Sequence, residues 1–335
     1  MSSSSLSSML PGAPWLLAHR SMLPVDQPCK VSLYGNDYVM WRDRNENITA
    51  LPNVCPHLGA MLSEGWCEAR PNGDSDVVCP FHALPFDSEG RTVLPGTDRK
   101  TLPQLEPLEL IVQGDFVWSY GPYEPTKPIP PILDEIASRY RFVGATADTS
   151  VATDLLTMLL NMHDYNHQNG THRDLFKIES VEFQKFVDEG HYSEAFFRAP
   201  TVSATLGEKL RHPEMMMLPK VIDAHLENFF PSLVILHSES ALGMIAQCHL
   251  FVPEADNRTR TYVLMFAEPR NALSSLMMGQ LLKVAQTVVE QDTDIITKLY
   301  PDTPQNIRLN NEVGLNWVRQ NFEHWPQVPA TNLSR

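Results

Sequence analysis

The sequence predicts an α+β protein of two domains, and three observations support this prediction. Residues 31–118 are short β-prone runs separated by turn formers, residues 122–131 hold five prolines, and helical and strand-like segments follow. A chain of 335 residues, 43% of them hydrophobic, is long enough to bury two ordinary cores. This composition excludes a disordered or collagen-like chain.

The first domain is expected over residues 15–121 as an antiparallel β domain, preceded by a flexible serine-rich tail over residues 1–14. Residues 30–34 and 38–41 predict two strands, and the Gly-Asn-Asp sequence at 35–37 predicts the turn between them. The start of the chain carries no Lys or Arg before its short apolar stretch, so a signal peptide is not expected.

The proline-rich residues 122–131 predict a linker, because helices and central strands accept proline poorly. A second domain of α+β type is expected over residues 132–330. Its predicted elements are a helix over 150–169, strands within 178–198 and 232–266, and a long helix over 274–300.

Charge and cysteine content narrow the classes of partner. The 40 acidic and 26 basic residues give a net charge of -14 without a basic stripe, so no nucleic-acid partner is expected. No apolar run approaches the roughly 20 residues that cross a bilayer, so no membrane span is expected. Five cysteines do not form the dense, even set of a secreted disulfide protein, which favours a cytoplasmic location.

Two mixed Cys-His pairs form the first candidate site. Cys55-Pro-His57 and Cys79-Pro-Phe-His82 each present one thiolate and one imidazole from a tight loop. A zinc site uses the same residue types, but zinc fingers usually group cysteine with cysteine and histidine with histidine. Mixed pairs favour a Rieske 2Fe-2S centre, in which both cysteines bind one iron and both histidines bind the other. The remaining cysteines are expected to be ordinary packed residues: Cys29, Cys67 and Cys248.

Residues 161–172 form a second candidate site, with three histidines and an aspartate in twelve residues. His163 and His167 are four apart and would share one face of a helix. His167 and His172 are five apart, about 500° of rotation at 3.6 residues per turn, so they could converge only if the helix ended between them. Asn169-Gly170 is a typical stop signal, and the residues alone leave both pairings open.

A two-histidine site becomes a facial triad for iron(II) when a carboxylate joins it. The expected long helix has an apolar stripe along one face: Leu281, Val284 or Ala285, Val288, Ile295 and Leu299. Asp292 falls inside that stripe, whereas Asp294 lies about 200° away with Glu290 and Lys298. Because a carboxylate on an apolar face costs several kcal/mol unless it is paired or binds a metal, Asp292 is the predicted third ligand.

The first site resembles the Rieske domain of the Rieske-type non-haem iron oxygenases. The resemblance is carried by Cys-Pro-His-Leu-Gly-Ala at 55–60, by residues 79–82, and by Phe-Asp-Ser-Glu-Gly at 86–90. The first of these loops is similar to that of sterol-desaturase-like and arylamine N-oxygenase-like branches. Two departures leave the ligands intact: Leu58 replaces a common arginine, and Ala-Leu at 83–84 replaces the usual Gly-Trp.

The second site resembles the iron-binding segment of the same family. Its spacing of Asn, Asp, His and His matches Asn161, Asp164, His167 and His172. The resemblance implies that the two matched histidines bind mononuclear Fe(II), that Asn161 lies at the site, and that His163 is outside the ligand set. His163 is expected near the ligands or exposed.

The resemblance also implies the arrangement around these ligands. Glu290-Gln291-Asp292 is similar to the segment that ends in the family's carboxylate ligand, which supports Asp292. In the family the matched aspartate links the mononuclear site to a Rieske histidine of a neighbouring subunit. This role is implied for Asp164, with His82 of the partner subunit as its contact, in a head-to-tail homotrimer. The second domain is accordingly expected to be helix-grip-like.

An oxygenase, of mono- or dioxygenase type, is therefore the expected enzyme (EC 1.14 type). A separate ferredoxin or flavin reductase using NADH or NADPH would reduce the cluster, which would pass electrons to the Fe(II) that binds O2. The chain itself has no dinucleotide glycine fingerprint. Basic residues near the Rieske loops are candidates for docking the reductase, or are scattered solubilising charges: Arg70, Arg91, Arg99 and Lys100.

The substrate is expected to be a bulky apolar or aromatic small molecule. Its pocket is expected within residues 201–266 and at Asn161, with methionines at 215–217 and phenylalanines at 229–230 that are equally explained as core. Hydroxylation is the first expectation, and desaturation, demethylation and arylamine N-oxygenation remain open. The non-enzymatic alternative is a Rieske electron-transfer or metal-binding protein with an inactive second site.

Overall fold

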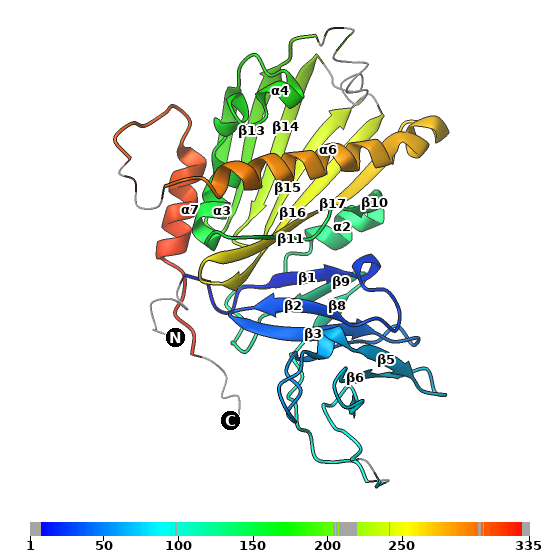
Figure 1. The fold of residues 1–335 in the computed structure, drawn as a ribbon. Helices are drawn as coiled ribbons and strands as arrows, with labels where there is room; N and C mark the ends of the chain where they lie inside the picture. Colours follow the sequence, from blue (N-terminus) through cyan, green and yellow to red (C-terminus); the bar gives the residue numbers. More distant parts are fainter. Residues whose placement is uncertain are drawn as a thin grey trace. The chain divides into compact units, whose positions relative to one another are not determined.

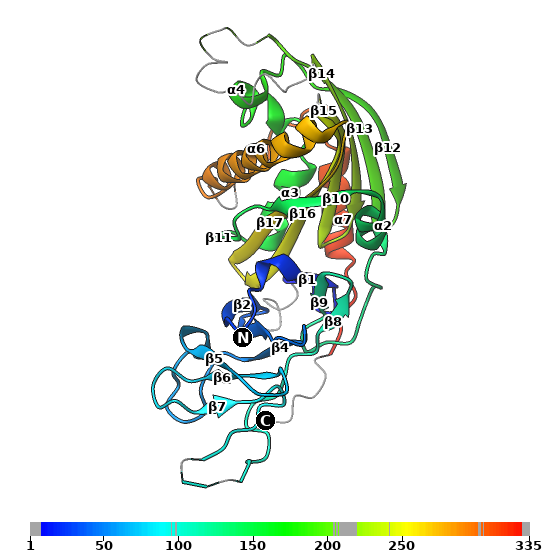
Figure 2. The same cartoon turned by 90° about the vertical axis from the view of Figure 1, so that its right-hand side faces the viewer.

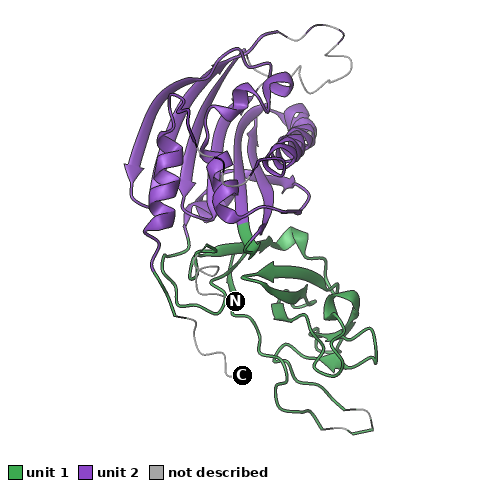
Figure 3. Ribbon diagram, turned by 60° about the vertical axis from the view of Figure 1, so that its left-hand side comes forward, with its two compact units in different colours: residues 1–129, 252–256, 327–335 green, residues 130–251, 257–326 purple. Residues whose placement is uncertain are grey.

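The computed structural model describes residues 8–329 except 95, 98, 204, 206, 208–219, 241, 301, 302 and 304. The chain divides into two compact units, which are coloured separately in Figure 3. Unit 1 comprises residues 1–129, 252–256 and 327–335, and unit 2 comprises residues 130–251 and 257–326. The boundary between Ile129 and Pro130 falls inside the proline-rich segment where a linker was expected.

Unit 1 contains three small antiparallel sheets, whose strands are labelled in Figures 1 and 2. The first has the order β1 (Trp15–His19), β9 (Phe116–Ser119), β8 (Ile111–Gln113). The second has the order β2 (Cys29–Leu33), β3 (Asn36–Arg42), β4 (Ile48–Pro52). The third has the order β5 (Trp66–Ala69), β6 (Ser75–Val78), β7 (Pro85–Phe86). Two 3-10 helices, η1 (Arg20–Met22) and η2 (Leu62–Glu64), lie in the connections. The predicted antiparallel β domain is confirmed.

The residues before β1 are packed into unit 1. Met9 and Leu10 are 1% and 0% exposed, and the backbone carbonyl of Leu10 accepts a hydrogen bond from Tyr34 Oη at 3.1 Å. The expected flexible tail is therefore wrong for residues 9–14, where the apolar run Met-Leu-Pro-Gly-Ala-Pro follows the serines and is buried. Residues 1–7 lie outside the described part of the chain.

Unit 2 is organised by an eight-stranded sheet. The strand order is β10 (Arg141–Ala145), β17 (Arg258–Pro269), β16 (Gly243–Ala255), β15 (Leu233–Ser240), β14 (Val221–Phe229), β13 (Tyr192–Pro200), β12 (Glu182–Glu189), and β11 (Thr149–Val151) also pairs with β17. The helices within the described residues of this unit are α2 (Ile132–Arg139), α3 (Leu155–His163), η3 (His167–Asn169), α4 (Arg173–Phe176), α6 (Ala272–Ile296) and α7 (Val313–Glu323). The predicted α+β class is confirmed.

The long helix α6 lies across one face of this sheet, as Figures 1 and 2 show. Met278 and Ala285 of α6 belong to small apolar clusters with residues of β16 and β17. Val289 and Ile296 are 6% and 3% exposed. The buried stripe of α6 therefore runs through Met278, Ala285, Val289 and Ile296, at steps of seven, four and seven residues. Asp292 lies within this stripe, three residues after Val289 and four before Ile296.

Part of the predicted stripe on α6 is wrong. Ile295 is 44% exposed because it is one residue, about 100°, away from the buried Ile296, and Leu299 is 57% exposed and lies beyond the end of α6 at Ile296. The inward position of Asp292 survives this correction, since its carboxyl is 19% exposed while that of Asp294 is 63% exposed.

By length and composition alone, α6 is also long and apolar enough to cross a membrane, so the expected absence of such a helix is not confirmed. In the structure its buried stripe packs on the sheet of unit 2, as the core helix of a folded domain does.

The helix expected over residues 150–169 is shorter than predicted. Asp154 caps the start of α3 by accepting from Thr157 N at 2.9 Å, and residues 149–151 form β11 instead. Helix α3 ends at His163, and the chain then turns through η3 before α4 begins at Arg173. Among the described elements of unit 2, five had no predicted counterpart: α2, β10, α4, β14 and α7.

Candidate metal centres

The two Cys-His loops of unit 1 share one backbone geometry. In each loop the cysteine N–H donates to a carbonyl five residues later, and the N–H four residues later donates to the cysteine carbonyl. These distances are 2.8 and 2.9 Å around Cys55 and 2.9 and 3.0 Å around Cys79. The equivalent fourth residues, Gly59 and Ala83, both have positive φ, at 78° and 54°. The loops therefore present their ligands as a pseudo-symmetric pair.

The cysteines and the histidines of these loops differ in burial. Cys55 and Cys79 are 2% and 1% exposed and lie in one apolar cluster, whereas His57 and His82 are exposed with ring centroids 4.7 Å apart. Burial, and the adjacent Cys79, raise the pKa of the Cys55 thiol. Two buried thiolates side by side require a strong positive charge between them. The set fits a 2Fe-2S cluster with its cysteine-bound iron inside and its histidine-bound iron at the surface.

A cavity of about 560 Å³ lies beside the two histidines. Its lining includes His57 and His82 together with Leu84, Phe86 and Leu94. Leu84 is one of the residues that border this space.

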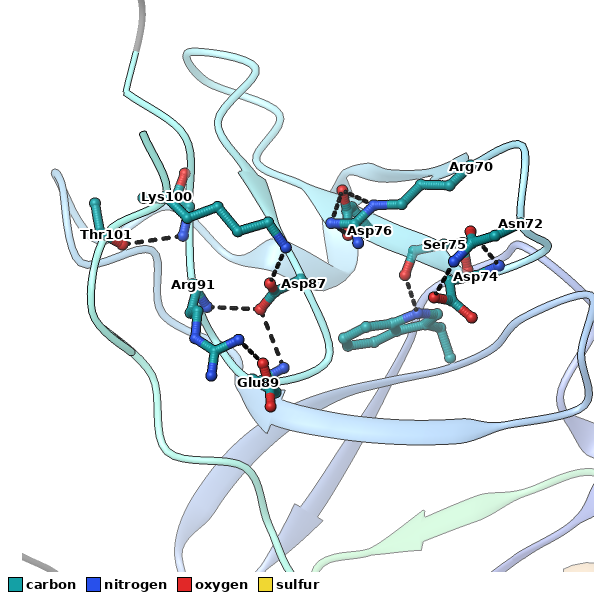
Figure 4. Close-up of polar contacts among 12 residues, drawn as sticks. Arg70, Asn72, Asp74, Ser75, Asp76, Asp87, Glu89, Arg91, Lys100 and Thr101 are labelled. Atoms are coloured by element: carbon teal, nitrogen blue, oxygen red, sulfur yellow. Dashed lines mark hydrogen bonds and ion pairs between the residues drawn. The ribbon is translucent and has the colours of Figure 1, made fainter. Parts of the chain in front are cut away.

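The basic residues near the loops are paired with carboxylates. Lys100 Nζ lies 2.8 Å from Asp87 Oδ2, and Arg70 makes hydrogen bonds of 2.7 and 2.9 Å to Asp76, as Figure 4 shows. Figure 4 also shows the remaining pair, Arg91 with Glu89. This patch is locally charge-balanced, because each of these three basic groups has an acidic neighbour, which weakens it as a docking surface for an acidic protein.

In unit 2, three side chains converge from two distant parts of the sequence. His167 lies in η3, His172 precedes α4, and Asp292 projects from α6. Their ligand atoms all lie within 4.8 Å of one another. Asp292 Oδ1 is 3.2 Å from His172 Nε2 and 3.6 Å from His167 Nε2. Two ligands at right angles on a first-row metal are about 3 Å apart, so these separations fit one shared ion.

Hydrogen bonds on the far side of each imidazole orient the two histidines. His167 Nδ1–H donates to the backbone carbonyl of Asp164 at 2.5 Å, and His172 Nδ1–H donates to Gln291 Oε1 at 2.9 Å. Each Nε2 lone pair is thereby turned toward Asp292. Within the described residues, His172 Nε2 and Asp292 Oδ1 are buried without a well-aligned hydrogen bond. Facing lone pairs of this kind are stabilised by a bound cation.

The electrostatics of the three groups agree with a cation site. Burial raises the pKa of Asp292, but contact with His172, the His167 charge and a hydrogen bond from Asn161 outweigh burial and lower it. Burial lowers the pKa of His172, and contact with Asp292 and Gln291 reverses this and raises it. Burial outweighs the Asp292 charge at His167 and lowers its pKa. A metal ion would take the place of the proton that His172 shares with Asp292.

His163 does not join this cluster. Its Nδ1–H donates to the carbonyl of Leu159 at 2.7 Å, and its ring lies 5.3 Å from that of Trp317, with the residue 2% exposed. The expectation that His163 might be exposed is wrong, and its pairing with His167 on one helical face fails because α3 ends at His163. Glu290 and Asp294 also stay outside, on the exposed face of α6.

An apolar cavity of about 120 Å³ lies between α6 and the sheet of unit 2. Strand residues such as Ala224 and Leu236 line it, as expected for residues 201–266, and α6 adds Leu281 and Val288, which were not expected there. Phe229 and Phe230 do not line it and pack against other aromatic rings, which is the core alternative. The methionines at 215–217 lie outside the described residues.

Two residues near the site carried no predicted role. Gln291 holds His172, and its position beside Asp292 was the available signal. His249 lines a small cavity with Asn161 and Asp292. Nothing in its sequence neighbourhood marked it, since it is one histidine in a strand. Asn161 lines the same small cavity and is hydrogen-bonded to Asp292, and its catalytic role stays a prediction.

Comparison with known proteins supports both centres. Residues 14–106 match the family model described as Rieske 2Fe-2S domain. Residues 151–317 match the model described as vanillate O-demethylase oxygenase C-terminal domain. The first match contains both Cys-His loops, and the second contains the three converging side chains.

Curated relatives are similar over part of their length. The chain is 28% identical over 187 residues to aminopyrrolnitrin oxygenase of Pseudomonas fluorescens, covering 52% of this chain and 49% of that protein. It is 25% identical over 187 residues to a vanillate O-demethylase oxygenase subunit of a Pseudomonas species, covering 55% and 50%. The chain thus spans about half the length of the curated relatives it matches.

Solved structures share the fold over nearly the whole chain. Dicamba monooxygenase bound to dicamba superposes with a TM-score of 0.73 at 17% identity, covering 94% of this chain and 96% of that one. The Pseudomonas putida protein NdmB superposes with a TM-score of 0.65 at 16% identity, covering 96% and 91%.

Proposed function

The chain belongs to the Rieske-type non-haem iron oxygenases, and on this premise we propose that it oxidises an apolar or aromatic small molecule with O2 and reductase-derived electrons. Hydroxylation by one oxygen atom is the favoured reaction. The chain would carry a 2Fe-2S cluster on Cys55, His57, Cys79 and His82, and mononuclear Fe(II) on His167, His172 and Asp292. When bound, the two groups supply one-electron transfer and activation of O2.

The observation that carries this proposal is the convergence of His167, His172 and Asp292 beside an apolar cavity. Three ligands leave further positions of a six-coordinate metal open. A purely structural metal site would instead surround its ion with protein ligands. The second-site residues thus favour an enzyme over an electron carrier.

The side chains around the triad hold the ligands in place. The carbonyl of Asp164 and the amide of Gln291 fix the tautomer and rotation of the two imidazoles. Asn161 orients Asp292 by its hydrogen bond. Apolar residues of α6 and the sheet exclude water from the space where the substrate binds, which protects an oxidising reaction from side reactions.

The cavity suits a substrate of modest size. Its volume of about 120 Å³ is close to that of a cavity of roughly 150 Å³ known to bind benzene. One aromatic ring therefore fits. Among related reactions, the names of the relatives support O-demethylation and oxidation of an arylamine nitrogen as alternatives, and desaturation remains a third.

The proposed working unit is a homotrimer in the cytoplasm. Asp164 would contact His82 of the partner subunit, and two large apolar side chains near the Rieske histidines, Leu58 and Phe81, are 65% and 61% exposed. Exposed apolar groups at this density support a protein contact there. The described cysteines are all free, which accords with a reducing compartment.

The test is reductase-dependent oxygen uptake. The purified chain, with a surrogate ferredoxin or flavin reductase and NADH or NADPH, is given small aromatic compounds, and products are identified by mass. We expect substrate-dependent O2 consumption and an added oxygen atom or a lost methyl group. Cluster reduction without any substrate-dependent O2 consumption would instead favour the electron-transfer alternative.

A further inference from the structure

The cavity of about 560 Å³ beside the two Rieske histidines has the size of a small-molecule site. A cavity of roughly 150 Å³ holds benzene, so this one has room for two or three fused rings. The two Cys-His loops contribute His57 and His82 to its lining. The segment that follows the loops contributes four further side chains: Thr92, Leu94, Thr101 and Gln104.

This following segment forms a wall that its own backbone holds in place. The N–H of Thr101 donates to the carbonyl of Thr92 at 2.8 Å, and the N–H of Thr92 donates to Thr101 Oγ1 at 3.1 Å. The N–H of Gln104 donates to the carbonyl of Gly90 at 2.8 Å. The wall is therefore formed before any ligand binds.

The hydroxyl of Thr92 takes no part in these bonds. Thr92 is 5% exposed, and within the described residues its Oγ1 is buried without a hydrogen-bond partner. A buried polar atom left in this way costs about 1–3 kcal/mol. Because Thr92 borders the cavity, a carbonyl oxygen or ring nitrogen of a ligand there can accept a hydrogen bond from this hydroxyl.

The lining suits a planar ring with neutral polar atoms. None of the described residues that line the cavity is Asp, Glu, Lys or Arg, and the nearby Asp87 and Lys100 are paired with each other, as Figure 4 shows. The oxidised cluster adds no net charge, because two sulfides and two thiolates balance two ferric ions. Leu84 and Phe86 supply apolar contacts.

The position of the cavity relates it to electron transfer. His57 and His82, the proposed ligands of the outer iron, both line it, so a ring bound there lies against the cluster's own imidazoles. The outgoing electron is proposed to leave through His82 to Asp164 of the partner subunit, which leaves His57 as a contact for an incoming donor. The paired basic groups nearby already weaken the alternative of an acidic protein donor.

We infer that this cavity binds the fused ring of a small organic electron carrier of the flavin or quinone class, which reduces the cluster directly. A carbonyl of the ring accepts from the Thr92 hydroxyl. In two successive transfers the reduced ring gives two electrons to the cluster and two protons to water, and becomes the oxidised ring. The separate reductase reduces the ring again with NADH or NADPH. This inference rests on the proposed function for the presence of the cluster.

The first test measures binding to the cluster-loaded, oxidised, full-length protein by equilibrium dialysis. The probes are lumiflavin, menadione and 2-methylnaphthalene, the last being menadione without its carbonyls. Leu84→Trp fills the cavity, and Thr92→Val removes the hydroxyl at nearly constant volume. The matched controls are Leu102→Trp, at an 81% exposed position, and Thr97→Val, an exposed residue whose hydroxyl donates to the Leu94 carbonyl at 3.0 Å.

The natural chain should bind lumiflavin or menadione saturably, and the tighter of the two identifies the flavin or the quinone class. Thr92→Val should weaken this binding about fivefold, the value of one net hydrogen bond, and should leave 2-methylnaphthalene within about twofold. Leu84→Trp should abolish saturable binding because its indole occupies the space. Both controls should bind as the natural chain does.

The second test follows cluster reduction without oxygen. Reduced lumiflavin or menadiol is mixed rapidly with the protein, and the loss of the cluster's visible absorption is recorded. The rate should saturate with carrier concentration in the natural chain and rise linearly in Leu84→Trp. The concentration dependence is compared, since Leu84→Trp also changes the reduction potential.

Four results would overturn the inference: no saturable binding of either carbonyl-bearing ring, unchanged binding in Leu84→Trp, an equal effect of Thr92→Val on all three probes, or a linear reduction rate in the natural chain. The oxygen-uptake test is separate. Saturable reduction without substrate-dependent oxygen uptake would refute the proposed function alone, whereas oxygen uptake with a protein ferredoxin and no ring binding would refute this inference alone.

Discussion

Gln291 and Asp292 are adjacent on α6 and contact the two different ring nitrogens of His172. Gln291 Oε1 accepts the Nδ1–H of His172 at 2.9 Å, while Asp292 Oδ1 lies 3.2 Å from its Nε2. Consecutive helical positions point about 100° apart, so two neighbouring side chains of α6 can contact the two nitrogens of the His172 ring. The helix thus supplies one ligand and fixes another.

Replacing Gln291 by leucine should weaken iron binding at the mononuclear site. The substitution removes the acceptor that holds His172, and loss of such a partner typically costs about 10- to 100-fold in metal affinity. The measurement is iron content against a competing chelator, with the cluster spectrum as an internal reference. Gln291→Glu retains an acceptor and should bind iron at least as tightly as the natural chain. Equal affinity in all three proteins would refute the orienting role.

Replacing Asp292 by alanine should remove the mononuclear iron and the oxygen uptake while the visible spectrum of the cluster persists. Asp292 is 19% exposed and faces two histidines, so its removal leaves an incomplete ligand set. The matched control is Asp294→Ala on the same helix, since Asp294 is 63% exposed and paired with Lys298. The measurements are the iron content and the oxygen uptake of both variants. Full activity in Asp292→Ala would show that Asp292 is not an iron ligand.

Motif spacing pointed to the side chains that the structure brings together, and their roles as metal ligands stay predictions. The Cys-His loops and the pattern of His167 and His172 are local in sequence, and the inward position of Asp292 followed from helical periodicity. The apolar stripe predicted around Asp292 was wrong at Ile295 and Leu299, because the buried face passes through Ile296 instead of Ile295 and α6 ends before Leu299. This error does not affect the position predicted for Asp292, since Asp292 lies within both the predicted stripe and the observed buried stripe of α6.

Other features depend on contacts between distant segments. The buried tail before β1 is a short Pro- and Gly-containing run without helical or strand periodicity, and its burial results from packing against residues such as Tyr34. His249 is a single histidine in an apolar strand, and its unpartnered nitrogen is visible only once α6 and α3 are placed over the sheet. Tertiary packing of this kind overrides local signals.

A carboxylate on the sheet of unit 2 should make stability depend on acid pH. Burial raises the pKa of Glu227, but hydrogen bonds from His237, at 2.6 Å, and Tyr192, at 3.0 Å, outweigh it and hold that pKa below its ordinary 4.5. Because the folded pKa is lower than the unfolded one, this stabilisation is present above pH 4.5 and is lost as pH falls through the folded pKa.

Glu227→Gln should therefore lower the free energy of unfolding by about 1–2 kcal/mol at neutral pH, with the difference shrinking below pH 4.5. Denaturant titrations across pH provide the measurement. Asp294→Asn, which removes an exposed ion pair, should change stability by less than about 1 kcal/mol at any pH. A Glu227→Gln effect that grows on acidification would contradict the assigned direction.

Filling the cavity beside the Rieske histidines should lower the reduction potential of the cluster. Leu84 lines that cavity, and Leu84→Trp would occupy part of it and shield His57 and His82 from water. Reduction adds negative charge, which a drier environment disfavours, so the expected change is a decrease on the order of tens of millivolts. Leu102→Trp, at an 81% exposed position, is the control. Spectroelectrochemical titration measures both, and an unchanged or raised potential in Leu84→Trp would refute the shielding argument.

Because the two Rieske loops share one backbone geometry, exchanging glycine and alanine at Gly59 and Ala83, four residues after each cysteine, should change stability in opposite directions. Ala83 has φ of 54°, a conformation that costs a residue with a Cβ about 1–2 kcal/mol, whereas Gly59 adopts φ of 78° freely. Ala83→Gly should relieve this strain, offset in part by the greater freedom of glycine in the unfolded chain, for a net gain of about 0.5–1 kcal/mol.

Gly59→Ala should destabilise the protein by about 1 kcal/mol. Among the described atoms, none lies within 4 Å of a Cβ added at Gly59, so the cost there is conformational and not a clash. Thermal bleaching of the cluster in the full chain measures both effects, with the midpoint rising for Ala83→Gly and falling for Gly59→Ala. If both midpoints moved in the same direction, the equivalence of the two loops would be wrong, because a shared backbone geometry requires opposite signs.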